Sequence, residues 1–289
     1  MSRFSIILII ITIVNLACVI CACSSSGTNS EVTNLITGNE WLHELLYLVP
    51  NKVEVCRFTN GIDIRNDAYQ TKEDAWFPED YSYYFGPIGT GLESHSDYQV
   101  YADGISIFVG YSELEYLQEM LPEVGSKQRE LFGTTIWDLE YEGSFFTMET
   151  KIGIVGNYPV MFNDDDVFQN WLSFFNSDTP SILEDSCFTE LLNRLPNGFY
   201  ITYSKSTPEN NDDDPVYLGS EPRASVLSFK DSNLCVLTAV IKYENTETAT
   251  NAEQLLTNDW QNDSSTPDID THVEDEYLIF VVENSKSEF

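Results

Sequence analysis

From residue 39 onward, hydrophobic residues alternate between helical spacing and strand spacing. Leucines at helical spacing lead up to Pro50, and an alternating stretch follows at residues 53–55. The same order returns around Pro196, with the alternating stretch at residues 199–203. Because proline ends a helix and alternation fits a half-buried strand, both places predict a helix, a tight turn and a strand.

These two places indicate an internal duplication. Residues 44–55 align without a gap on residues 190–201, and both segments contain Glu-Leu-Leu followed by Pro-Asn. Self-similarity of this kind predicts that two parts of the chain fold alike.

A strand followed by a helix also occurs twice. Residues 105–111 alternate, and Ser112 then opens a predicted helix that ends at Pro122. Residues 236–243 repeat the plan, with Thr250 as the predicted start of the helix. In each case Ser or Thr is followed three residues later by Glu, which is the pattern of a capping box.

A hairpin follows in both halves. The first runs over residues 151–162 with its turn at Gly156-Asn157, and the second over residues 271–282 with its turn at Glu274-Asp275. Hairpins favour antiparallel pairing. The predicted fold class is therefore α+β, with two duplicated units of mostly antiparallel sheet flanked by helices, the first at residues 39–180 and the second at residues 181–289.

One predicted helix belongs to the first unit alone. Residues 167–175 carry hydrophobic side chains at helical spacing, and Asp164, Asp165 and Asp166 precede them. Acidic residues favour the positive N-terminal end of a helix, so this run predicts a helix start. A calcium site is the less favoured interpretation of this run and of the acidic residues 210–214, because neither has the loop pattern of a calcium-binding hand.

The N-terminus has the layout of an export signal. Arg3 is followed by a hydrophobic stretch at residues 6–20 and then by small residues and cysteines, which is typical of a secretory signal. Ile20-Cys21-Ala22-Cys23 resembles a bacterial lipobox, and by that resemblance residues 1–22 are a lipoprotein signal peptide and Cys23 carries the lipid. Cys18 is the weaker candidate, and an uncleaved membrane anchor is the alternative.

Residues 23–38 predict a flexible tether. They are rich in Ser, Thr, Asn and Gly, and a flexible segment of this length spans roughly 20 Å. The expected location is therefore the cell membrane, with the folded part lipid-anchored and facing outside the cytoplasm.

Charge narrows the choice of partners. The chain has 47 acidic and 14 basic residues and a formal net charge of −33, so phosphate backbones repel it and nucleic acid is not an expected partner. Hydrophobic residues make up 42% of the chain, which is enough to form a core. Beyond Cys23 only Cys56, Cys187 and Cys235 remain, so at most one disulfide forms among them.

Three segments resemble a known family. Residues 133–137, 152–163 and 183–198 are similar to a strand, a hairpin and a helix entry of an exported bacterial family, the domain-of-unknown-function family 3352. The resemblance covers most of residues 40–289 in order. Ser186-Cys187 stands where such motifs usually have Pro-Asp. The resemblance implies an exported protein and brings no catalytic residues.

Motifs for catalysis and for cofactors are not found in the sequence. His43, His95 and His272 have no second ligand nearby in the chain, and no nucleophile elbow, zinc-protease motif or phosphate-binding glycine loop occurs. We therefore expect no cofactor, no metal and no enzymatic activity.

The best candidate for a contact site is an aromatic and acidic stretch at residues 75–87. Aromatic rings beside carboxylates suit glycan stacking or peptide contact. The alternative is that these rings anchor a long insertion on the sheet. The candidate residues are Trp76, Phe77, Tyr81, Tyr83 and Tyr84.

The sequence thus predicts a membrane-anchored envelope lipoprotein that acts by binding or scaffolding. Its expected partners are the membrane, through the N-terminal lipid, and an envelope protein or a glycan. The alternative is an exported hydrolase directed at glycans or peptides and using acidic residues.

Overall fold

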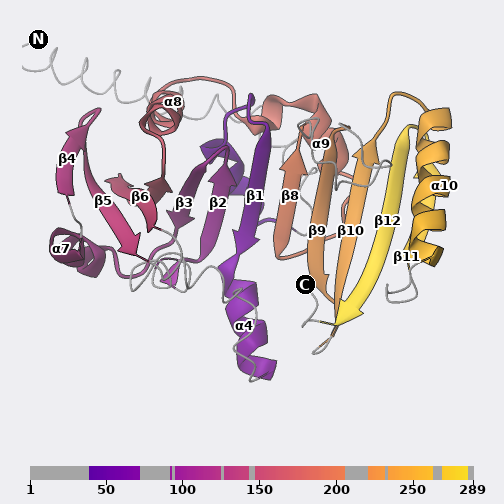
Figure 1. The fold of residues 1–289 in the computed structure, drawn as a ribbon, viewed down its shortest axis with the longest axis horizontal. Helices are drawn as coiled ribbons and strands as arrows, with labels where there is room; N and C mark the ends of the chain where they lie inside the picture. Colours follow the sequence, from indigo (N-terminus) through magenta and orange to yellow (C-terminus); the bar gives the residue numbers. More distant parts are fainter. Residues whose placement is uncertain are drawn as a thin grey trace, which may run out of the picture.

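The described part of the chain forms one twisted antiparallel sheet with helices on both faces (Figure 1). The computed structural model describes residues 39–71, 92, 95–124, 127–142, 147–205, 221–231, 234–262 and 269–285. Within these residues the sheet has 12 strands in the order β11-β12-β10-β9-β8-β1-β2-β3-β7-β6-β5-β4. The predicted α+β class with mostly antiparallel pairing is confirmed.

The strands and helices follow the chain as Figure 1 labels them. The strands are β1 Val55–Asn60, β2 Tyr98–Ala102, β3 Ile105–Val109, β4 Lys127–Leu131, β5 Thr134–Glu142, β6 Thr147–Val155, β7 Tyr158–Phe162, β8 Tyr200–Ser204, β9 Arg223–Phe229, β10 Leu234–Lys242, β11 Ile269–Glu274 and β12 Tyr277–Ser285. The helices are α3 Leu42–Leu45, η1 Leu46–Leu48, α4 Gly61–Thr71, α7 Leu114–Val124, α8 Asp165–Phe175, η2 Ile182–Glu184, α9 Ser186–Leu192 and α10 Thr246–Asn262.

The strand order repeats on either side of the middle of the sheet. Outward from β1 come β2, β3, β7 and β6, and outward from the adjacent β8 come β9, β10, β12 and β11. The helix after the third strand is α7 in the first unit and α10 in the second. The two predicted units therefore share one continuous sheet, and the first unit adds β4, β5 and α8 to the common plan.

The gap-free alignment of the two units is wrong by one residue in the strands. Across the central pair, Cys56 lies opposite Tyr203 and Phe58 lies opposite Ile201, and all four are buried in one core cluster. The gap-free alignment ends by matching Val55 with Ile201, but Val55 precedes Cys56 in the strand, so its side chain points to the other face because successive strand residues alternate. The correct alignment of the two strands is set by the face of the sheet that each residue occupies, not by the number of identical residues.

Two predicted helix boundaries need correction. Helix α7 runs two residues past Pro122, to Val124. Helix α10 begins four residues before Thr250, whose hydroxyl donates instead to the carbonyl of Thr246. The residue that caps α10 is Asn245, because its side-chain oxygen accepts from the backbone N–H of Thr248. In addition, the turn of the second hairpin lies at Asp275-Glu276, one residue later than predicted.

The acidic start of α8 is confirmed. Asp164 is its N-cap, with a side-chain oxygen that accepts from the backbone N–H of Asp166 at 2.7 Å. Four hydrophobic residues of the helix are buried, and the indole of Trp171 donates to the carbonyl of Leu48 at 3.0 Å. Helix α8 is thereby fixed over the sheet and against η1.

The main core joins the two units on one face of the sheet. The ring of Phe188 in α9 lies 6.3 Å from that of Phe58 and 5.2 Å from that of Tyr203. Neighbouring residues of a strand point to opposite faces of the sheet. Ile107 belongs to the main cluster, and Phe108 belongs to a second cluster under α7. We call these the α8–α9 face and the α7–α10 face.

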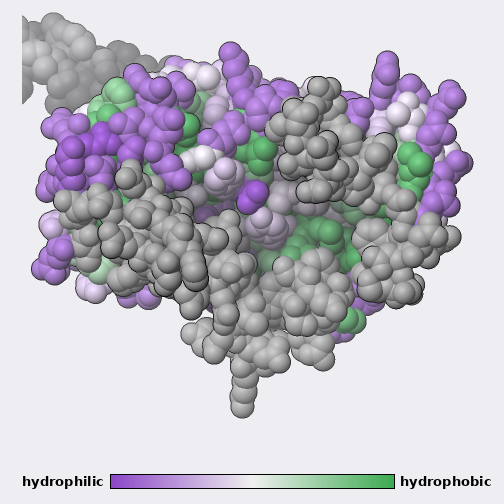
Figure 2. All heavy atoms as spheres, viewed as in Figure 1, coloured by the Kyte–Doolittle hydropathy of each residue, from purple (hydrophilic) through white to green (hydrophobic). Residues whose placement is uncertain are grey.

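The view in Figure 2 shows hydrophilic residues towards both ends of the described surface and hydrophobic residues over β9 and β10. Among the residues that the structure describes, no helix is both long enough and hydrophobic enough to cross a membrane.

Candidate functional site

The site residues predicted from the sequence lie outside the described residues. Cys23, the predicted lipid attachment point, precedes Asn39, where the described fold begins. The predicted aromatic contact residues fall between the end of α4 and Leu92: Trp76, Phe77, Tyr81, Tyr83 and Tyr84. These assignments stay predictions.

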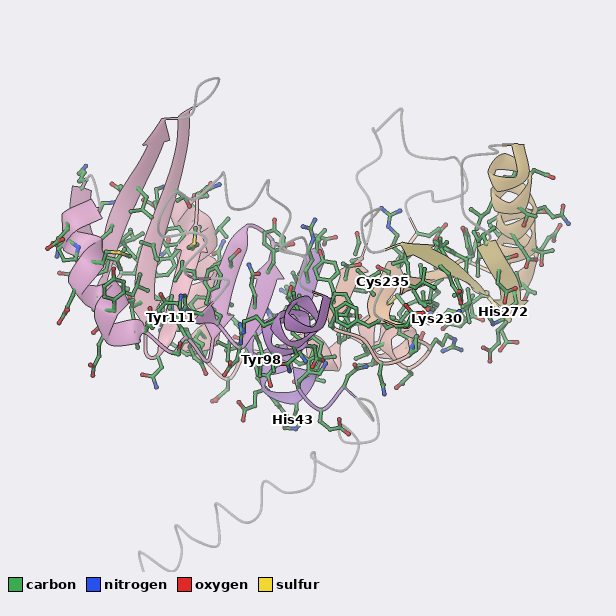
Figure 3. The ribbon with its side chains drawn as sticks, turned by 90° about the horizontal axis from the view of Figure 1, so that it is seen from below. His43, Tyr98, Tyr111, Lys230, Cys235 and His272 are labelled. Atoms are coloured by element: carbon green, nitrogen blue, oxygen red, sulfur yellow. The ribbon has the colours of Figure 1, made fainter. Side chains whose placement is uncertain are left out.

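The histidines lie in separate parts of the fold. Figure 3 shows His43 near the middle of the molecule and His272 at one end, while Tyr111, whose ring contacts His95, lies towards the other end. Within the described ranges, no group of three or more His, Cys, Asp or Glu side chains could hold a metal ion.

A polar cluster lies under the first turn of α8. Arg129 donates two hydrogen bonds to Asp165, at 2.7 and 3.0 Å, and its Nε donates to Asp138 at 3.2 Å. Lys151 approaches the same Asp165 carboxylate at 3.0 Å. The guanidinium of Arg129 therefore holds the pKa of Asp165 below its ordinary value. Because every charge here has a partner, this cluster fixes β4 and β6 to α8.

A second cluster ties α9 to strands β10 and β12 of its own unit. The carboxylate of Glu190 accepts from the ammonium of Lys242 and, at 2.9 Å, from the hydroxyl of Tyr277. The guanidinium carbon of Arg194 lies 3.6 Å from the centre of the Tyr277 ring. Lys242, followed by Tyr277, lowers the pKa of Glu190. These contacts lock a helix to the sheet and leave no group poised for proton transfer.

The described residues include three thiols and one buried tyrosine hydroxyl that the clusters above do not use. Cys56, Cys187 and Cys235 are all free cysteines. The hydroxyl of Tyr203 is buried beside the thiol of Cys187 and has no nitrogen or oxygen hydrogen-bond partner among the described residues. Burial, followed by the charge of Asp185, raises the pKa of Tyr203 far above its ordinary value. Burial is also the main cause of the raised pKa of Cys56. Neither group is activated for nucleophilic chemistry.

A broad depression lies at the start of α7. Its volume is about 780 Å³, and it is lined by His95 and residues 112–116. Its two carboxylates, Glu113 and Glu115, come from one short segment, and Glu113 approaches His95 at 3.6 Å. Two carboxylates facing each other across a cleft, as a hydrolase of the glycosidase type needs, are not found here.

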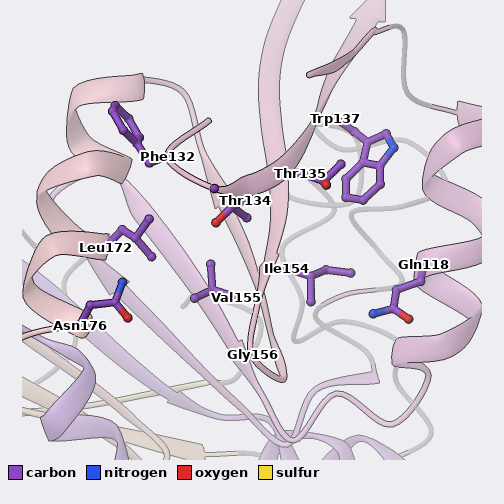
Figure 4. A pocket seen from close by; sticks show the side chains of 11 residues that line it. Gln118, Phe132, Thr134, Thr135, Trp137, Ile154, Val155, Gly156, Leu172 and Asn176 are labelled. Atoms are coloured by element: carbon purple, nitrogen blue, oxygen red, sulfur yellow. The ribbon is translucent and has the colours of Figure 1, made fainter. Parts of the chain in front are cut away.

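A second cavity lies between two hairpins of the first unit, and we call it the hairpin cleft (Figure 4). Its volume is about 620 Å³. Figure 4 shows Leu172 and Asn176 of α8 on one side and Gln118 of α7 on the other. The lining residues are Gln118, Phe132, Gly133, Thr134, Thr135, Trp137, Ile154, Val155, Gly156, Leu172 and Asn176.

The cleft exists because two strands part before they end. The register between β5 and β6 stops at Ile136 and Gly153, although β5 begins at Thr134 and β6 runs to Val155. Each strand stays paired with its own hairpin partner, β4 or β7, up to the turn. The two hairpin tips therefore diverge and leave a gap in the sheet.

Residues from both faces of the sheet line this gap. Val155 packs in the main core of the α8–α9 face, whereas Trp137 and Ile154 belong to the cluster under α7. Helix α8 thus contributes to one side of the cleft and α7 to the other, as Figure 4 shows.

The rim of the cleft carries an unusual residue. Phe132 has a φ of 51° and is followed by Gly133 with a φ of 80°, which is a hairpin turn that ordinarily takes Asn-Gly. A bulky residue in this left-handed region costs about 1–2 kcal/mol. Phe132 is nevertheless 49% exposed, so burial of its ring offsets only part of this cost.

The described residues thus define a class of protein: an α+β protein with one antiparallel sheet built from two similar halves. No protein-family model matches the chain, and no curated protein sequence matches it.

Two solved structures of TP0453 have a similar fold. Crystal form I matches with a TM-score of 0.50 and 14% identity over 83% of this chain and 92% of that chain. Crystal form III matches with a TM-score of 0.49 and 13% identity over 84% of this chain and 94% of that chain. At this level of identity, the match to crystal form I shows a shared fold and carries no statement about a ligand.

Proposed function

We propose that the protein is a membrane-anchored envelope lipoprotein that binds a ligand or partner through its extracytoplasmic part. The observation that carries this proposal is the N-terminal sequence, in which Arg3, a hydrophobic stretch and Ile20-Cys21-Ala22-Cys23 follow in the order of a lipoprotein signal. The described fold begins at Asn39, so residues 24–38 separate it from Cys23. The resemblance to the domain-of-unknown-function family 3352 agrees with export and stays a prediction.

A binding role is favoured over hydrolysis by the two cavities. The hairpin cleft is lined without a carboxylate, and the two carboxylates at the other depression, Glu113 and Glu115, come from one short segment of the chain. The contact residues predicted from the sequence, Trp76 and its aromatic neighbours up to Tyr84, offer a second surface for an envelope protein or a glycan.

Labelling with a fatty-acid analogue tests the anchor. Cys23→Ala should abolish labelling and leave an uncleaved precursor, because both lipid attachment and cleavage depend on that thiol. Cys18→Ala is the matched control and should be labelled and processed like the wild type. If Cys18→Ala alone abolishes labelling, Cys23 is not the lipid attachment point. If the wild-type chain is unlabelled and remains in the membrane at precursor mass, the protein has an uncleaved anchor and the lipoprotein proposal is wrong.

A further inference from the structure

We propose that the hairpin cleft is a binding site for a short, uncharged glycan. This inference rests on the binding role proposed above and names the class of ligand and the site. The argument uses the size, the chemistry and the position of the cleft in the duplicated fold.

The size of the cleft suits a small ligand. Pockets that hold small molecules have volumes of about 300–1,000 Å³, and the hairpin cleft has about 620 Å³. Its lining includes residues from both faces of the sheet, such as Thr135 and Trp137 from one face and Val155 and Leu172 from the other. A cleft of this kind surrounds an oligosaccharide more fully than a flat surface does.

The polar lining suits hydroxyl groups. Thr134 and Thr135 provide hydroxyls, and Gln118 and Asn176 provide amides. Hydroxyls and amides both donate and accept hydrogen bonds, which is what the hydroxyls of a sugar require. None of the lining residues is charged, although the chain as a whole carries −33. An acidic sugar would be repelled by the overall charge and find no cation in the cleft.

The aromatic part of the lining suits the hydrophobic C–H face of a sugar ring. Phe132 lines the cleft and keeps about half of its surface exposed. An exposed aromatic ring packs against the C–H face of a sugar while the polar groups around it bind the hydroxyls. The turn holds this ring at the rim even though a positive φ disfavours phenylalanine there.

An extended peptide fits the cleft less well. Peptides that add to a sheet need a run of open strand edge with alternating side-chain positions. Beyond the last β5–β6 pair, only Thr134 and Thr135 remain on one strand and Ile154 and Val155 on the other. Two residues on each side provide too little edge for a strand.

The cleft is also built by parts of the first unit that the duplication does not explain. Hairpin β4–β5 and helix α8 have no counterpart in the described second unit. They contribute Phe132, Gly133, Thr134, Thr135, Trp137, Leu172 and Asn176 to the lining. The second unit forms its part of the sheet without such a hairpin or helix, so the cleft is a feature of the first unit alone among the described residues.

Calorimetric titration of the purified full-length protein tests the proposal. The probes are chitotriose, cellotriose and maltotriose, with trigalacturonic acid as the charged sugar and a neutral hexapeptide mixture as the peptide. At least one neutral trisaccharide should bind. Phe132→Asn and Thr135→Val should each weaken that binding by about tenfold or more, as expected for a central contact. Tyr116→Ala removes a similarly exposed aromatic ring, 57% against 49% for Phe132, outside the cleft and should bind like the wild type.

Each other outcome overturns the proposal. If no neutral trisaccharide binds, or if only the peptides or the acidic sugar bind, the ligand class is wrong. If a trisaccharide binds and both cleft variants bind it equally well, the site lies elsewhere. Because Cys23 labelling is measured separately, a labelled lipoprotein that binds no sugar would refute the glycan site and leave the anchor proposal intact.

Discussion

Asp103 and Val55 are joined by two hydrogen bonds that run in opposite directions. The backbone N–H of Asp103 donates to the carbonyl of Val55 at 3.0 Å, and the N–H of Val55 donates to the carboxylate of Asp103 at 2.8 Å. The same carboxylate accepts from the N–H of Glu54 at 3.0 Å. The turn between β2 and β3 is thereby fixed to the first residue of β1.

Asp103→Ala should therefore lower the free energy of unfolding by about 2 kcal/mol, because two backbone N–H groups lose a charged acceptor. Urea denaturation measures this loss. Asp275→Ala is the control, since Asp275 also has a positive φ, 54° against 42° for Asp103, but no hydrogen bond to its carboxylate is found among the described residues. Equal losses in the two variants would show that backbone conformation, not the hydrogen bonds, explains the effect.

Tyr203→Phe should leave the free energy of unfolding unchanged or raise it by up to about 1 kcal/mol, because the buried hydroxyl has only the weakly hydrogen-bonding thiol of Cys187 beside it among the described residues. Tyr277→Phe should lower it by about 1 kcal/mol, since the Tyr277 hydroxyl donates to Glu190 at 2.9 Å. Chemical denaturation of both variants makes the comparison. A loss in Tyr203→Phe as large as in Tyr277→Phe would mean that the Tyr203 hydroxyl has a partner.

The contribution of the Arg129–Asp165 ion pair to the free energy of unfolding should decrease at acidic pH. Because Arg129 lowers the pKa of Asp165 in the folded state, the pair stabilises the protein fully above the unfolded pKa of about 3.9. This contribution is lost as the pH falls below that value towards the lower folded pKa. Both side chains are partly exposed, so solvent screening limits the effect to about 1 kcal/mol.

Asp165→Asn should thus be less stable than the wild type at pH 7 and approach it in stability as the pH falls below about 4. Thermal or urea unfolding across the pH range measures the difference. Asp166→Asn is the matched control, because it removes a neighbouring charge from the same helix turn without touching Arg129. A difference between Asp165→Asn and wild type that stays constant down to the lowest pH would contradict the ion-pair explanation.

The repeated plan of the fold could be predicted from the sequence, because helix, turn and strand patterns are local. The hairpin β6–β7 and the acidic cap of α8 were predicted for this reason, and the structure confirms both. The match of Val55 with Ile201 was wrong by one residue, since identical residues in an alignment do not record which face of the sheet a residue occupies. Asn245 was missed as a cap because Thr250, followed by Glu253, matches the capping-box pattern and Asn245, followed by Thr248, does not.

The hairpin cleft could not be predicted in the same way. Phe132-Gly133 between two short strands is a turn signal that indicates hairpin β4–β5. However, the parting of β5 from β6 depends on how two hairpins twist against α7 and α8, and no local pattern contains that information. The candidate lining residues are threonines, amides and hydrophobic residues, which occur throughout the chain and carry no motif.

Phe132→Asn should raise the free energy of unfolding even though it weakens glycan binding at the hairpin cleft. Asparagine adopts a positive φ more readily than phenylalanine, so the turn relaxes and the free energy of unfolding should rise by about 0.5–1 kcal/mol. The ring is half exposed, so its removal costs little buried surface. Phe132→Ala is the control for the ring alone, since alanine removes the same side chain and keeps the backbone cost; it should be no more stable than the wild type. Urea denaturation of both variants measures the difference. If Phe132→Asn is destabilised as much as Phe132→Ala, the ring packs as part of the core. The exposed aromatic surface on which the glycan site depends would then not exist.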